Sequence, residues 1–224
     1  MARGADGNIT PIVFVEFSVA GSSIDIIQEL SAVLTPEQVA VDPASLETYG
    51  QDWTRFTPPA PTAIVFPRDT ADVVAVVECA RRCQFALVPS GGRTGLSGGA
   101  CAANGEVVVS MDKMNAISPV NLTERTVTVG AGAITQNVQQ AARDADLFYP
   151  VDFASSGSSQ IGGNIATNAG GINVIRYGMT REWVAGLTVV TGKGEEIAIT
   201  KCLMKNNTGL DFRQLFTGTK GIYG

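Results

Sequence analysis

The sequence contains no histidine, and this absence removes a large part of enzyme chemistry. A Ser-His-Asp or Cys-His nucleophile system cannot be assembled from the chain, and neither can a histidine general base. The four cysteines include no Cys-x-x-Cys pair, so we expect no metal site. Cys79 and Cys83 lie one helical turn apart, which is more typical of small core residues than of a redox pair. This cysteine usage favours a reducing, cytoplasmic setting.

Basic residues and long apolar runs are also scarce. Lys plus Arg number 16 against 21 Asp plus Glu, which gives a net charge of −5. Because nucleic-acid binding needs a basic face, we expect no nucleic-acid partner. The apolar stretch at 12–20 is interrupted by Glu16 and is too short to span a membrane. We interpret residues 1–21 as an irregular leader.

What remains is the composition of a globular protein with strand-helix-strand order. Apolar residues make up 45% and charged residues 17% of the 224 residues. Residues 22–57 predict an N-terminal helical segment, and prolines at 58–61 mark a linker. Residues 63–66 predict a buried strand, and residues 86–89 predict a second one. Thr70 is expected to cap the helix between them. Strand, helix and strand within about 30 residues form a βαβ unit with parallel strands.

Further elements are expected after this unit. They are strands at 106–110 and 126–130, a helix at 135–145, a hairpin of 184–191 with 195–200, and a short helix at 210–216.

A glycine-rich loop follows the second strand directly and is the strongest chemical signal. Residues 89–100 read Pro-Ser-Gly-Gly-Arg-Thr-Gly-Leu-Ser-Gly-Gly-Ala. Glycines let the backbone approach a ligand, and successive N–H groups form an anion-binding nest. The hydroxyls of Ser90, Thr94 and Ser97 add donors, and Arg93 adds charge. The loop therefore predicts a pyrophosphate cradle. The alternative is a flexible surface loop, although such linkers rarely follow a βαβ strand directly.

Three familiar motifs do not describe this loop. A P-loop needs a Gly-Lys pair, and the loop has no Lys. The nearest Rossmann match is 130–132, with Thr135 where the third glycine should fall. Residues 95–99 match Gly-x-Ser-x-Gly, but without histidine Ser97 lacks its usual base.

A second cluster spans residues 150–171, where two glycine doublets bracket Asn164, Thr167 and Asn168. Asparagine amides both donate and accept hydrogen bonds, which suits a flavin ring edge or phosphate oxygens. Tight packing of a glycine-rich loop is the alternative. Two such clusters in one chain favour a single extended cofactor groove.

At these residues the chain resembles the FAD-binding domain of the p-cresol methylhydroxylase and vanillyl-alcohol oxidase superfamily. It is most similar to the branch of D-lactate, glycolate and D-2-hydroxyglutarate dehydrogenases. The motifs that carry the resemblance are P-S-G-G-R-T-G-L-S-G-G-A (89–100), V-G-A-G (129–132), I-G-G-N-I-A-T-N-A-G-G (161–171), R-Y-G (176–178) and the stretch 206–221.

The resemblance implies an α+β fold with FAD held between two lobes. One would be a small parallel βαβ lobe, and the other a larger, mostly antiparallel sheet lobe with flanking helices, together spanning residues 58–224. The activity implied is oxidation of a 2-hydroxy acid by hydride transfer to FAD. The residues implied to contact FAD are Ser90, Gly91, Gly92, Arg93, Thr94, Gly95, Ser97, Gly98, Pro150, Gly157, Ser158, Gly162, Gly163, Asn164, Thr167, Asn168, Gly170 and Ile222.

The end of the sequence departs from the family pattern. In the family, a Glu stands where this chain has Lys220, and Ile222-Tyr223 replaces a small residue and Leu. The catalytic base and the metal-binding histidines of the family lie in a C-terminal substrate domain that this sequence lacks. We therefore expect FAD binding without complete turnover and assign no catalytic residue. The alternatives are a catalytically inactive FAD-binding fragment and a sugar-alcohol oxidase of the same fold.

Overall fold

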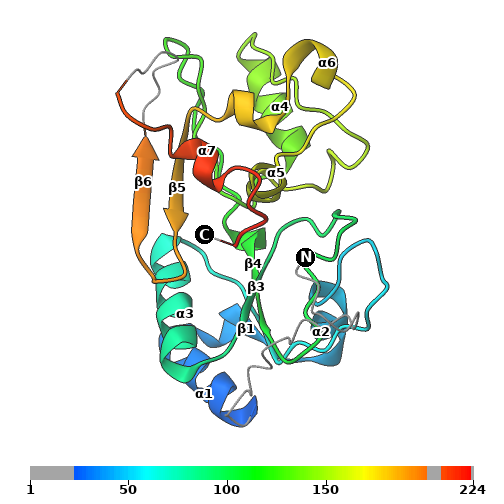
Figure 1. Ribbon diagram of the computed structural model, residues 1–224, viewed down its shortest axis with the longest axis vertical. Helices are drawn as coiled ribbons and strands as arrows, with labels where there is room; N and C mark the ends of the chain where they lie inside the picture. The colour runs from blue at the N-terminus through cyan, green and yellow to red at the C-terminus, as the bar shows by residue number, and fades with distance from the viewer. Residues whose placement is uncertain (1–22, 201–207, 223–224) are drawn as a thin grey trace, which may run out of the picture.

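The computed structural model describes residues 23–200 and 208–222 (Figure 1). The expected leader at 1–21 lies outside these residues. The helices are α1 (Ser23–Val33), α2 (Pro43–Tyr49), α3 (Thr70–Cys83), α4 (Thr135–Asp144), α5 (Ile161–Thr167), α6 (Val174–Tyr177) and α7 (Arg213–Phe216). Short 3-10 turns are η1 (Pro36–Gln38), η2 (Met111–Lys113) and η3 (Thr180–Trp183). The strands are β1 (Val39–Ala40), β2 (Ala63–Val65), β3 (Leu87–Ser90), β4 (Val107–Ser110), β5 (Gly186–Val190) and β6 (Glu196–Thr200).

The larger sheet has four strands in the order β1-β2-β4-β3. Strands β2, β4 and β3 run parallel, and β1 is antiparallel to β2. The predicted parallel βαβ unit is confirmed, but β2 and β3 are not neighbours because β4 lies between them. The carboxyl ends of β3 and β4 meet at one edge, where Ser90 pairs with Ser110.

The helix of this unit begins at Thr70, the residue that was expected to be its cap. Asp69, rather than Thr70, is the N-cap, and its carboxylate accepts the N–H of Asp72 at 3.0 Å. An ionised side chain at this end also suits the helix dipole. The helix ends at Gln84 in the left-handed conformation.

Helices cover both faces of the four-stranded sheet. The alternation of side chains along a strand sends Val107 and Val109 to one face and Val108 to the other. The first face packs against α1 and α3, and the second against α2 through Leu46 and Tyr49. Burial on both faces explains why β2 and β4 are continuous apolar runs.

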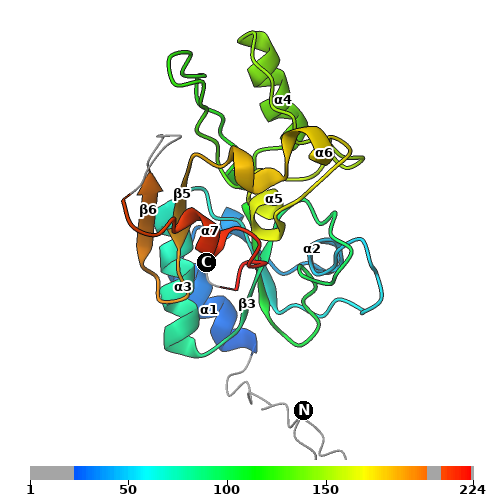
Figure 2. The ribbon, with the colours of Figure 1, turned by 45° about the horizontal axis from the view of Figure 1, so that its top comes forward.

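A separate core lies beneath α4 and α5, which stand together with α6 away from the sheet (Figures 1 and 2). The expected strand at 126–130 appears there only as isolated antiparallel bridges. Pro119 has no N–H for a ladder, and the Ser118 hydroxyl accepts the N–H of Thr128 at 3.0 Å. The expected larger antiparallel sheet is therefore not present in the described part of the chain, and the parallel sheet is the larger one.

The predicted hairpin is confirmed as the antiparallel pair β5–β6. Its turn is tied to α3, because Arg81 donates to the carbonyl of Lys193 at 2.6 Å. Helix α7 lies between this hairpin and α5 in both views (Figures 1 and 2). Across 23–200 and 208–222, no helix combines the length and apolar character needed to cross a membrane.

Candidate functional site

A cleft of about 2540 Å³ opens where the parallel strands end. It is larger than the roughly 300–1,000 Å³ of an ordinary small-molecule pocket. The glycine-rich loop after β3 lines one part of it, and residues 158–170 line another. Ligands of open α/β sheets commonly bind outside the carboxyl ends of the strands, and this cleft has that position.

The glycines of the loop after β3 serve two purposes. A Cβ at Gly92 would stand 2.1 Å from the carbonyl oxygen of Ser158, so only glycine allows the two loops to touch there. A Cβ at Gly98 or Gly99 would meet nothing within 4 Å. The loop is thus packed at its start and open further along.

Asp52 anchors the far half of this loop, and nothing in its sequence context pointed to it. The N–H of Gly98 donates to its carboxylate at 2.8 Å, and the hydroxyl of Thr54 donates at 2.6 Å. Burial acts to raise the pKa of Asp52, but hydrogen bonds from Thr54, Cys101 and Gly98 outweigh it and lower the pKa. The ionised carboxylate therefore fixes the loop.

Arg93 is held by neighbouring protein groups. It has a positive φ of 55°, and its guanidinium lies 4.3 Å from the centre of the Tyr49 ring. It donates to the carbonyl of Gly91 at 3.0 Å and stands 3.8 Å from the Asp112 carboxylate. Because the charge is engaged in this way, Arg93 chiefly braces the loop, and a direct contact with phosphate remains a prediction.

Asp112 joins the two sides of the cleft. It accepts the Tyr49 hydroxyl at 2.8 Å and the Gln160 amide at 2.6 Å. Burial and the Asp112 carboxylate together raise the pKa of Tyr49, which keeps the phenol protonated as a donor. Arg93 of the first glycine-rich segment lies over Tyr49 and near Asp112, and Gln160 belongs to the second segment, so this network connects the two. Sequence reasoning missed Asp112, Tyr49 and Gln160.

The second glycine-rich cluster is partly helical, which the sequence did not indicate. A Cβ at Gly162 would lie 2.8 Å from Ala131 Cβ, whereas one at Gly163 would meet nothing within 4 Å. Glycine thus allows α5 to pack closely on residue 131, and the other glycine of the doublet lines the cleft.

Several polar side chains expected to contact a cofactor have partners within the protein. The Asn164 amide is buried and donates to the Thr135 hydroxyl at 2.7 Å. The Thr167 hydroxyl donates to the carbonyl of Gly163 at 2.8 Å. Asn168 ends α5 in the left-handed conformation, and its carbonyl oxygen accepts the N–H of Arg181 at 3.0 Å. These contacts shape the wall of the cleft and leave FAD contacts by these residues as predictions.

The cleft lining divides the predicted residues into two groups. Four of them do not line it, namely Gly98, Pro150, Gly157 and Asn168. The residues that line it are Ser90, Gly91, Gly92, Arg93, Thr94, Gly95, Ser97, Ser158, Gly162, Gly163, Asn164, Thr167, Gly170 and Ile222. Both loops therefore face one common space.

The segment near the C-terminal end lies along α5. The N–H of Gly218 donates to the carbonyl of Ile165 at 3.0 Å, and that of Lys220 donates to Ala166 at 2.7 Å. Lys220, which replaces the Glu of the family pattern, has a φ of 61°. Ile222 follows with its side chain 78% exposed and lines the cleft.

The groups of the cleft fit an extended dinucleotide such as FAD. Two buried polar atoms among the described residues have no hydrogen-bond partner, the Ser90 hydroxyl and the Gln160 carbonyl oxygen. Both residues line the cleft. A buried polar atom is costly unless a ligand or water bonds it, so these atoms suit a polar ligand. Gly99 and Gly163 also line the cleft, and a Cβ at either would meet nothing within 4 Å.

Comparison with known proteins agrees with this geometry. Residues 61–200 match the family model described as FAD binding domain. The chain is 58% identical over 199 residues to a D-2-hydroxyglutarate dehydrogenase of Stutzerimonas stutzeri (strain A1501), covering 89% of this chain and 43% of that protein. It is 34% identical over 214 residues to a mitochondrial D-2-hydroxyglutarate dehydrogenase of Bos taurus, covering 96% of this chain and 39% of that protein. It thus spans less than half the length of these relatives.

A solved structure of alkyldihydroxyacetonephosphate synthase has the same fold, with a TM-score of 0.78 and 20% identity over 88% of this chain and 38% of that one. The family model covers most of the sheet, both glycine-rich segments and the β5–β6 pair. The chain therefore belongs to the FAD binding domain family, and its cofactor is FAD.

Proposed function

We propose that this chain is the FAD-holding part of an oxidoreductase that oxidises a 2-hydroxy acid of the D-2-hydroxyglutarate, D-lactate or glycolate type. The observation that carries the proposal is the 58% identity, over 89% of the chain, to a protein named D-2-hydroxyglutarate dehydrogenase. When bound, FAD supplies the hydride-accepting chemistry. The described residues supply the binding and the orientation.

The residues of this chain divide that work between them. Ser90 and the backbone around Gly99 would hold the pyrophosphate, because Ser90 carries a buried hydroxyl without a partner and a Cβ at Gly99 would meet nothing within 4 Å, so that a ligand can approach the backbone there. Asp112 would connect the two glycine-rich segments through Arg93 of the first and Gln160 of the second. We further propose the two-lobed arrangement, with FAD between the sheet and the α4–α5 core, and a cytoplasmic location.

The first test is the flavin itself. We expect the purified chain to be yellow, with a flavin absorbance that denaturation releases as intact FAD. Protein that is colourless and also fails to take up added FAD would contradict the binding role. Substitution of Ser90 by Ala should raise the dissociation constant for FAD, since the orphaned hydroxyl is then absent.

The second test concerns the substrate class. We expect D-2-hydroxyglutarate to bleach the bound flavin under anaerobic conditions, with D-lactate and glycolate as the comparison acids and L-2-hydroxyglutarate as the control. FAD uptake without bleaching by any hydroxy acid would instead support an inactive FAD-binding fragment. Bleaching by a sugar alcohol alone would support the sugar-alcohol oxidase of the same fold. Because a sugar-alcohol oxidase of this fold would also bind FAD, a yellow colour alone does not distinguish it from the proposed 2-hydroxy acid oxidoreductase.

A further inference from the structure

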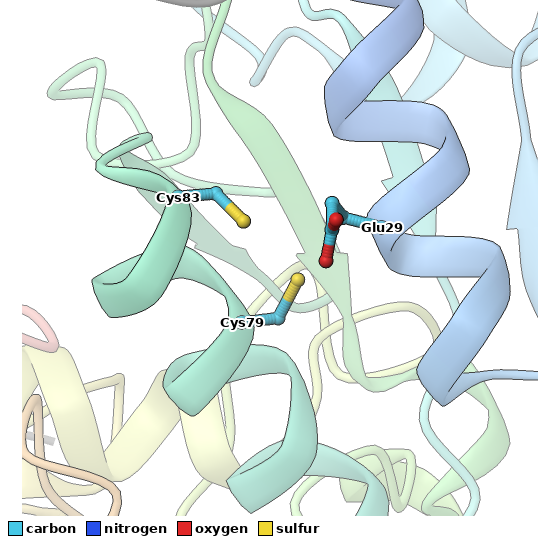
Figure 3. Close-up of side chains that lie close together, drawn as sticks. All are labelled: Glu29, Cys79 and Cys83. Carbon is cyan, nitrogen blue, oxygen red and sulfur yellow. The ribbon is translucent and has the colours of Figure 1, made fainter.

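Two cysteines and a carboxylate meet on the outer side of the sheet, away from the FAD cleft. Cys79 and Cys83 come from α3 and Glu29 from α1, and the three side chains point toward one another (Figure 3). One ligand-type atom from each residue lies within 4.8 Å of the other two. None of the three residues lines the cleft.

The spacing of these atoms suits a thiolate-binding cation. A tetrahedral zinc ion with Zn–S of about 2.3 Å would hold two sulfurs about 3.8 Å apart. Because the three atoms already lie within 4.8 Å of one another, the two sulfurs need to approach by at most about 1 Å, which side-chain rotation on α3 can provide. The pair is four residues apart on one helix face, so the backbone already directs both sulfurs to one point.

Packing alone accounts for only part of this arrangement. Cys79 is fully buried in the core between α1, α3 and the sheet, as a small apolar residue would be. Cys83 is half-buried and packs against the edge of this core, and Glu29 is half-buried as well, yet both side chains point toward the Cys79 thiol (Figure 3). A carboxylate beside two thiols gains nothing from apolar packing.

The charge around the cluster also suits a bound cation. Arg82 donates to the Glu29 carboxylate at 2.7 Å and lies 3.8 Å from the Cys79 sulfur. Two thiolates, one carboxylate, one divalent cation and this guanidinium sum to zero formal charge. Burial, and then Cys83, raise the pKa of the Cys79 thiol to about 11, so this thiol is protonated at neutral pH when no metal is bound.

We propose that Glu29, Cys79 and Cys83 form a site for a soft divalent cation such as Zn²⁺ or Cd²⁺, which clamps α1 to α3. Binding forms two metal–sulfur bonds and one metal–oxygen bond. The two thiol protons pass to solvent, the cation keeps its oxidation state, and water takes the fourth position. The proposal departs from the expectation from the sequence that the chain holds no metal, since the third ligand would come from a helix about 50 residues earlier in the chain than Cys79.

The test is a titration of the purified reduced chain with Cd²⁺ under anaerobic conditions. The cadmium–thiolate charge-transfer band is followed as a difference spectrum, so that bound flavin cancels. The parent for the titration carries Cys101→Ser and Cys202→Ser, which leaves Cys79 and Cys83 as its only thiols. We expect one equivalent bound, with half-saturation at about 1 µM or lower, and a higher melting temperature with Zn²⁺.

Two variants separate ligation from folding. Cys83→Ser changes a half-buried position and should raise the half-saturation concentration by at least about 100-fold, and Glu29→Gln by roughly 10–100-fold. Each variant should melt close to the metal-free parent. Uptake of less than one equivalent by the parent would overturn the proposal, and so would equal uptake by Cys83→Ser. A band that survives in Glu29→Gln with unchanged affinity would remove Glu29 from the site.

Discussion

Replacing Gly163 by Ala should stabilise the protein without FAD while weakening FAD binding. Gly163 is the third residue of α5, and a Cβ there would meet nothing within 4 Å. An alanine in a helix is more favourable than glycine by about 0.5–1 kcal/mol. For a chain of this size that corresponds to a rise in melting temperature of roughly 1–4 °C. Thermal unfolding of FAD-stripped protein measures it.

The same methyl group points into the space that FAD should fill, since Gly163 lines the cleft. Overpacking of a close contact costs about 1–3 kcal/mol. One tenfold step in affinity is about 1.4 kcal/mol, so the dissociation constant for FAD should rise by roughly 5- to 150-fold. Quenching of flavin fluorescence, titrated with stripped protein, gives this number.

Gly92→Ala is the contrasting variant, because its Cβ would stand 2.1 Å from the Ser158 carbonyl oxygen. It should destabilise the FAD-free protein by about 1–3 kcal/mol or more. A lower melting temperature for Gly163→Ala would contradict the conclusion that a Cβ at this position has open space around it. If it left FAD affinity unchanged, α5 would not face the cofactor.

Three further variants test the polar groups of the cleft. Ser90→Ala should leave the stability of the FAD-free protein unchanged, because it removes a buried hydroxyl without a partner. The same variant should bind FAD more weakly in a binding titration. Asp52→Asn should cost about 1–3 kcal/mol in urea unfolding at pH 7; the folded pKa of Asp52 lies below its ordinary 3.8, so this difference should shrink as the pH falls below about 4. Tyr49→Phe should cost about 0.5–1.5 kcal/mol by losing its bond to Asp112; no loss would mean that the bond does not brace the cleft.

The parts of the site that follow from local sequence were predictable. The loop after β3 was placed correctly, because a buried strand that runs into Gly, Ser and Thr signals where a sheet edge meets a ligand. The second cluster, at 150–171, was also expected to be part of the same groove, and most of its residues from 158 to 170 line the cleft together with the first loop. Composition and spacing along the chain were enough for these.

The groups that act at long range were not predictable. Asp112 meets Gln160 across 48 residues and Tyr49 across 63, and neither pairing leaves a periodic pattern. Asn164 is predicted to contact FAD because its amide can donate and accept; it lines the cleft, and its amide nitrogen also donates to Thr135, a contact that the sequence did not indicate. Only the packing of α5 on α4 determines that contact.

The prediction of secondary structure from the sequence was wrong where tertiary contacts oppose the local preference of the residues. Residues 161–167 contain a glycine doublet, which is unfavourable in a helix, but Ile161 and Ile165 pack into the core beneath α4 and hold the helix. Residues 126–130 alternate like a strand, yet Pro119 and Ser118 across from them interrupt the ladder.

The strand order of the sheet has a consequence for synthesis of the chain. Because β4 lies between β2 and β3, the chain up to residue 90 is synthesised with two parallel strands that have no partner between them. Each has an unsatisfied row of backbone donors and acceptors until residues 107–110 arrive. The glycine-rich loop separates β3 from that central strand, so the nascent chain must hold an apolar, unpaired edge while the future cofactor loop is translated.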